Sequence, residues 1–198
     1  MLNLNYPLNL KFKLAVINPQ FSMTDAAGKP VAYVKQKAFK LKEDISVYTS
    51  EAQTNLQFKI KADRWLDFNA SYALTDATGK DVGRLARKGA RSIWKAEYEL
   101  YDENGKKDLT LQEDNAWVKV LDGLLGEIPV LGLFTGYFLN PKYNITRPDG
   151  TLVATLTKKP DLVSRAFTLD KKADFEDGEE TRIVLGTMMM VLLERARG

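Results

Sequence analysis

The side chains that carry most enzyme chemistry are missing from this chain. Its 198 residues include no cysteine and no histidine. That composition excludes thiolate nucleophiles, disulfides, Cys/His zinc sites and every catalytic arrangement that needs a histidine base. Carboxylates, lysine and tyrosine remain as acid–base groups, but no spacing among them marks a catalytic constellation. We therefore expect a protein that is not an enzyme and that uses no cofactor.

Basic side chains follow three similar segments of the chain and are the strongest candidates for ligand binding. They are Lys35, Lys37, Arg84, Arg87, Lys88, Lys158 and Lys159. If the three segments are related around one sheet, these residues lie at equivalent levels and some of them share a rim. Such a rim would attract anionic headgroups at about 1 kcal/mol per nearby charge. The alternative interpretation is that these charges discourage strand edges from pairing and keep the protein soluble.

An acidic segment precedes the last apolar stretch of the chain. Its carboxylates are those of Asp174, Glu176, Asp177, Glu179 and Glu180. A calcium loop needs oxygen ligands at regular alternate positions, and these residues do not keep that spacing. An acidic loop that leads into a helix N-terminus explains the segment, because negative charge is favourable there. We predict no metal site.

The elements that must position these side chains begin with a pattern that is written three times. The copies are FSMTDAAGKPVAYVK from Phe21, YALTDATGKDVGRLAR from Tyr72 and YNITRPDGTLVATLTK from Tyr143. Each copy has an aromatic residue first, an aliphatic residue third, threonine fourth and glycine eighth. A strand that runs into a polar turn with glycine and then runs back has this pattern. We predict three related hairpins near residues 21–35, 72–88 and 143–159.

Alternation of apolar and polar residues predicts strands through most of the remaining chain. Leu2 to Val16 alternate strictly, which is typical of a strand with one buried face and not of a signal sequence. Many short strands joined by turn signals favour a closed barrel or a sandwich. No linker divides the chain, so we expect one domain over residues 1–198. Without a signal sequence, we expect a cytoplasmic protein.

A helical segment is expected near residues 115–139, inserted between strands. Trp117 begins an apolar face at helical spacing, and an uncharged stretch that includes Leu133 and Phe134 follows. This stretch of about a dozen residues is shorter than the roughly 20 that a membrane-spanning helix needs. Two interpretations remain open. The segment packs in the core, or Trp117, Leu133 and Phe134 contact a membrane surface or a partner.

A second helix is expected near residues 180–196, and it is apolar on every side. The run IVLGTMMMVLL from Ile183 to Leu193 contains no charge. A helix without a polar face must be surrounded. In a chain that is otherwise β, the inside of a barrel is the place that surrounds it. The three methionines 188–190 would adapt to an irregular lumen.

These features together resemble the tubby C-terminal-like superfamily, and most closely its LURP-one-related and phospholipid scramblase-like members. The hairpin FSMTDAAGK resembles a LURP-one-related hairpin, and TRIVLGTMMMVLLERARG is similar to the final helix of both groups. The resemblance implies a mainly β protein, a closed barrel of about twelve strands around a buried C-terminal helix. It also implies affinity for phospholipid headgroups, although fold alone does not determine function.

Two classes of non-enzymatic function follow. The first is a binding module for phospholipid headgroups, or for another anionic or apolar ligand, at the inner face of a membrane. The alternative is a structural or protein-interaction domain without a small ligand. The net charge of +3 and the pI of about 8.9 are compatible with an anionic partner. They are below what a dedicated nucleic-acid binder shows, so we expect no nucleic acid partner.

Overall fold

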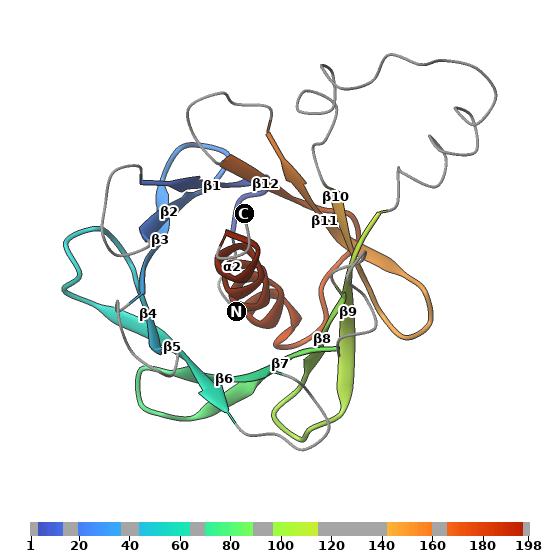
Figure 1. Ribbon diagram of the computed structural model, residues 1–198. Helices are drawn as coiled ribbons and strands as arrows, with labels where there is room; N and C mark the ends of the chain where they lie inside the picture. The colour runs from blue at the N-terminus through green and yellow to red at the C-terminus, as the bar shows by residue number, and fades with distance from the viewer. Residues whose placement is uncertain are drawn as a thin grey trace, which may run out of the picture.

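A closed β-barrel surrounds one long helix in the computed structural model (Figure 1). The structure describes residues 4–13, 20–36, 44–63, 70–88, 97–114, 142–159 and 166–195. The strands are β1 (Leu8–Phe12), β2 (Gln20–Thr24), β3 (Pro30–Gln36), β4 (Asp44–Tyr48), β5 (Leu56–Asp63), β6 (Ala70–Asp76), β7 (Asp81–Arg87), β8 (Glu97–Tyr101), β9 (Lys107–Glu113), β10 (Lys142–Thr146), β11 (Leu152–Lys158) and β12 (Ala166–Lys171). The helix is α2 (Glu179–Arg195).

Each strand pairs antiparallel with its neighbours in the sequence, and β1 closes the ring by pairing with β12. The period-2 pattern explains this arrangement, since alternate side chains point to opposite faces of a sheet. In β1, Leu8, Leu10 and Phe12 are buried while Asn9 and Lys11 face outward. The mainly β class, the closed barrel and the buried C-terminal helix are confirmed.

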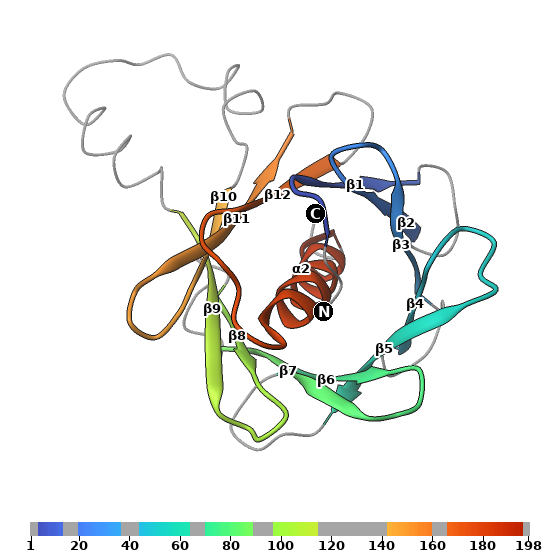
Figure 2. The ribbon, with the colours of Figure 1, turned by 180° about the vertical axis from the view of Figure 1, so that it is seen from behind.

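The antiparallel order gives the barrel two distinct ends. The connections after β2, β4, β6, β8 and β10 lie at one end, which we call the turn end. The segment 172–178, which joins β12 to α2, lies there as well. The odd-numbered strands run toward the opposite end, which we call the far end. Figure 2 shows the same ring from behind, with α2 inside it.

The three predicted hairpins are β2–β3, β6–β7 and β10–β11. In each hairpin the register shifts next to the threonine of the pattern, at Met23/Thr24, Leu74/Thr75 and Ile145/Thr146. The glycine of each turn has a positive φ, +78° at Gly28, +91° at Gly79 and +89° at Gly150. Glycine adopts this conformation at little steric cost, which is why the pattern requires it.

A fourth hairpin, β8–β9, repeats the same geometry although the pattern does not reveal it. Its register shifts at Leu100/Tyr101, and Gly105 has a φ of +77°. Tyr101 stands where the other copies have threonine, and Asp108 stands where they have valine. These two replacements hide the relationship. The membership of β8–β9 in the repeat is therefore visible only in the structure.

The helix α2 fills the barrel and is buried on all sides. Met188, Met189 and Met190 are consecutive, so they point in three directions, and each is at most 1% exposed. The helix packs against β7 and β8. A Cβ on Gly186 would lie 2.8 Å from Leu100 Cδ2, so a larger residue there would force the Leu100 side chain to move.

Two sequence predictions have other outcomes. The N-terminal strand begins only at Leu8, because Pro7 has no N–H to donate to a ladder. The predicted helical segment near 115–139 lies outside the described residues, and with it Trp117, Leu133 and Phe134. Among the helices that the structure describes, none is long and apolar enough to cross a membrane.

Candidate anion-binding face

Three neighbouring strands align two lysines on the outer wall of the barrel. The register pairs Lys35 of β3 with Ser46 of β4, and Ser46 with Lys59 of β5. All three are on the outward side, since their neighbours Val34, Ile45 and Ile60 are buried in the lumen. Adjacent strands are about 4.8 Å apart, so the Cα atoms of the two lysines are roughly 10 Å apart. The small Ser46 side chain lies between them.

A second row of the same kind runs alongside. Lys61 of β5 pairs with Ala73 of β6, and Ala73 pairs with Arg84 of β7. Here a methyl group lies between two cations. We call the four cations Lys35, Lys59, Lys61 and Arg84, with Ser46 and Ala73 between them, the basic face.

The four cations differ in whether another side chain of the protein already pairs with them. Lys35 Nζ donates a 3.3 Å hydrogen bond to Gln53 Oε1, and Arg84 Nε forms a 3.0 Å ion pair with Asp63 Oδ2. Lys59 and Lys61 have no ion pair with any residue that the structure describes. Two long side chains on either side of a small residue can close on one phosphate or carboxylate.

A buried carboxylate lies beside the basic face on the outer wall. Glu99 is only 4% exposed, and its Oε1 pairs with Lys107 Nζ at 2.6 Å and with Lys88 Nζ at 3.2 Å. The Tyr101 hydroxyl donates to Glu99 Oε2 at 2.8 Å. Burial raises the pKa of Glu99, but the bonds from Lys107, Tyr101 and Lys88 outweigh it, so the net pKa is lowered. Lys88 is therefore held by a local carboxylate.

The remaining predicted basic residues lie elsewhere. Arg87 pairs with Tyr98, and Lys158 pairs with Phe167, so both occupy inward-facing positions at the far end. Lys159 Nζ donates to Asn9 Oδ1 at 2.8 Å. Lys37 lies outside the described residues. The strands β3, β7 and β11 end at the same end of the barrel but are each separated by three other strands. The structure therefore does not bring the six described residues of this set to one point.

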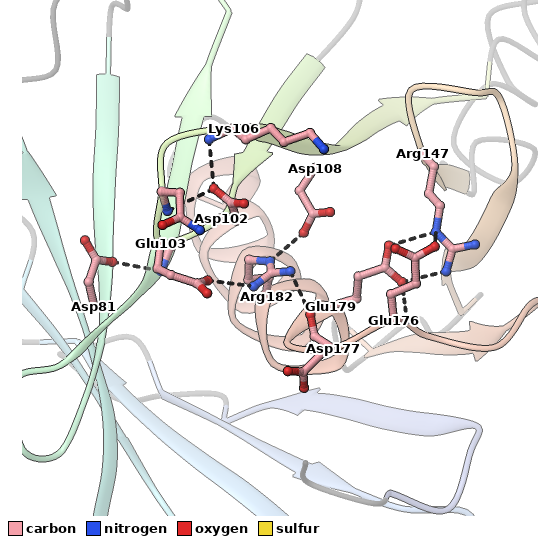
Figure 3. Close-up of polar contacts among 12 residues, drawn as sticks. Asp81, Asp102, Glu103, Lys106, Asp108, Arg147, Glu176, Asp177, Glu179 and Arg182 are labelled. Carbon is pink, nitrogen blue, oxygen red and sulfur yellow. Dashed lines mark hydrogen bonds and ion pairs between the residues drawn. The ribbon is translucent and has the colours of Figure 1, made fainter.

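The acidic segment anchors the start of α2 (Figure 3). Arg147, from the β10–β11 turn, donates Nε to Glu179 Oε1 at 2.8 Å and Nη2 to Glu179 Oε2 at 2.7 Å. Glu179 Oε2 also accepts the Glu176 N–H at 2.8 Å. This bond caps the start of α2, because the Glu179 carboxylate reaches back to a backbone N–H three residues earlier. Among the described residues, no group of three or more acidic side chains is placed to hold a metal ion.

A second arginine ties α2 to the β8–β9 hairpin. Arg182 is 5% exposed, and its Nε donates to Asp108 Oδ2 at 2.5 Å. Its guanidinium also reaches Glu103 Oε2 at 3.4 Å and the Asp177 carbonyl oxygen at 3.1 Å. Burial raises the pKa of Asp108 even though Arg182 opposes the change. Both arginines thus hold the helix in the lumen, which is a structural role.

Lys59 and Lys61 were missed by the sequence reasoning. The signal was present, because the two lysines alternate with Phe58 and Ile60 in β5 and must therefore share one face. The register that puts them beside Lys35 and Arg84 was not readable from the sequence.

Comparison with known proteins identifies the family of this chain. A model of the LURP-one-related proteins matches residues 30–176, more than half of the chain. This chain belongs to the LURP-one-related family. The match ends before α2, so the structure alone shows how the helix completes the LURP-one-related barrel. A search of the curated proteins found no match.

Proposed function

We propose that this LURP-one-related protein is a non-enzymatic binding module that holds anionic phospholipid headgroups on its basic face. The observation that carries the proposal is the cross-strand row in which Lys35 and Lys59 flank Ser46. Lys61 and Arg84 extend it on the next row. A phosphate held there would accept bonds from cations on two strands.

The filled lumen supports a surface site. In lipid-binding barrels that enclose a ligand, the interior is open. Here α2 fills it, since Ile183, Leu185 and Val191 are each at most 1% exposed. A phospholipid headgroup would therefore bind outside the filled lumen. The headgroup proposal needs only exposed cations and no catalytic group.

Vesicle flotation tests this proposal. The double variant Lys59→Glu/Lys61→Glu should weaken binding to vesicles with phosphatidylserine more than about ten-fold, since each nearby cation contributes about 1 kcal/mol. Binding of the unchanged protein should fall as salt rises, because exposed charges are screened over about 8 to 10 Å. The matched control is Lys29→Glu/Lys106→Glu, which makes the same charge change in two exposed turns. It should bind almost as well as the unchanged protein.

The outcome also separates the alternatives. Binding that survives charge reversal and high salt, and that is lost when Leu133 and Phe134 become serine, would move the contact to that apolar stretch. Absence of binding to vesicles of any composition would reject lipid recognition. The protein-interaction domain would then be the better proposal.

A further inference from the structure

A cavity of about 370 Å³ opens at the turn end of the barrel, beside the start of α2. Three segments that are distant in the sequence form it. Leu4 and Tyr6 come from the N-terminal segment, and Lys171 ends β12. Residues 174–178 come from the connection after β12, and Glu180 and Thr181 from the first turn of α2. Its size is within the range of small-molecule sites.

One wall of this cavity is aromatic. The rings of Tyr6 and Phe175 meet edge to face, with centroids 5.6 Å apart. The Tyr6 hydroxyl oxygen is buried and has no well-aligned hydrogen-bond partner among the described residues. Burial, and then the nearby Glu180 carboxylate, raise the pKa of Tyr6. The hydroxyl therefore stays protonated at neutral pH.

The rest of the lining is acidic. Asp174, Glu176, Asp177 and Glu180 all border the cavity, against one lysine. A helix N-terminus favours anions in general. Here the carboxylates already occupy that position, so a further anion would be repelled. The field in the cavity favours a cation.

The chain itself already places an ammonium group on the aromatic wall. Lys171 Nζ lies 5.0 Å from the centroid of the Phe175 ring and 2.9 Å from Asp174 Oδ1. This is a cation–π contact combined with an ion pair, the combination by which proteins recognise organic cations. Lys171 thus shows which chemical group fits and also competes for the site.

We propose that the cavity binds a primary ammonium group carried on an alkyl chain, either in a free amine or in a lysine side chain of a partner. Phe175 and Tyr6 would contact the alkyl chain, and Asp177 would face the charge. A metal ion suits the cavity less well, since no three acidic side chains of the described residues converge on one point. This inference does not depend on headgroup binding, because it concerns other residues.

An NMR titration of the full chain with n-butylammonium chloride tests the proposal. Saturable shifts are expected for amides of residues 4–6 and 171–181, with no saturation by butan-1-ol, which has nearly the same shape without the charge. Asp177→Asn should weaken binding about three- to five-fold, the size of an exposed charge contact. Lys171→Gln should strengthen it by a similar factor, since it removes the competing ammonium. Lys29→Gln, an exposed turn lysine, is the control and should change nothing.

Lys171→Gln decides the question, because a merely destabilised protein would not bind more tightly. An unchanged or weaker affinity in this variant would overturn the proposal, as would equal binding of butan-1-ol. If calcium chloride shifted the same amides and saturated at a lower concentration than the amine, the proposal would be overturned in favour of a metal site. N-acetyl-lysine methylamide distinguishes the two sources. Tighter binding of this compound than of butylammonium assigns the site to a partner's lysine, and equal binding assigns it to a free amine.

Discussion

Gly83 shows how one residue adapts a repeated hairpin to the helix inside the barrel. The corresponding residues in the other two copies of the pattern are Ala32 and Ala154. Gly83 has a φ of +141°, and a Cβ there would lie 2.3 Å from the Tyr101 carbonyl oxygen and 3.0 Å from Arg182 Cδ. The Tyr101 carbonyl oxygen and the buried Arg182 side chain both lie against this position, so only glycine leaves room for them.

Gly83→Ala should therefore lower the free energy of unfolding by roughly 3 kcal/mol or more, since backbone strain and overpacking add. Gly28→Ala is the control. Gly28 also has a positive φ, but no atom lies within 4 Å of the added Cβ. Its loss should be about 1 kcal/mol, from strain alone. Urea denaturation of both variants measures the difference, and equal losses would contradict the close packing of Tyr101 and Arg182 against Gly83.

At the scale of the element, the start of α2 depends on the pairing of Glu179 with Arg147. Glu179 is 1% exposed. Burial raises its pKa, but the Arg147 bonds and the Glu176 N–H outweigh this, so its net pKa is below the ordinary 4.5. A carboxyl whose pKa is lowered on folding stabilises the protein above its unfolded pKa. That stabilisation is lost as the pH falls through the folded pKa.

Glu179→Gln should destabilise the protein by roughly 2–4 kcal/mol at pH 7, because Arg147 loses its charged partner. The difference between the variant and the unchanged protein should shrink as the pH falls below about 4.5. Thermal denaturation from pH 7 to pH 3 measures it. Asp174→Asn, at a fully exposed carboxylate, is the control and should leave the melting temperature unchanged. A difference that stays constant with pH would show that the charge of Glu179 is unimportant.

At the scale of the whole molecule, the barrel and its helix are one folding unit. The inner faces of all twelve strands and every face of α2 form a single core cluster. Neither part can bury its apolar surface without the other. The barrel wall is therefore not expected to fold independently of the helix.

Leu185→Asp tests this dependence. Leu185 is 1% exposed, and an unpaired charge in the lumen costs several kcal/mol against a total stability of roughly 5 to 15 kcal/mol. We expect no cooperative unfolding transition by circular dichroism. Met189→Leu, a volume-conserving change in the same helix, should cost less than about 1.5 kcal/mol. A Leu185→Asp protein that still unfolds cooperatively would show that the barrel stands without a filled lumen.

The sequence alone determined the fold class, and the reason is local. Alternation of period two marks which face of a strand is buried, and the turn glycines mark where the chain reverses. A helix with no polar side, IVLGTMMMVLL, requires an enclosing wall. Each of these signals is contained in a short stretch of sequence, so it can be recognised without knowledge of the rest of the chain.

Only the tertiary structure decided which side chains become neighbours. Lys35 and Lys59 share a row because the register shift at Val47/Tyr48 and the longer β4–β5 turn align Ser46 with Lys59. Arg87 and Lys158 end their copies of the repeated pattern, as Lys35 does, but they occupy inward-facing positions of their strands. Register depends on turn length and bulges, and a slip of one residue would reverse every face. For that physical reason the barrel was predictable from the sequence, and its basic face and its turn-end cavity were not.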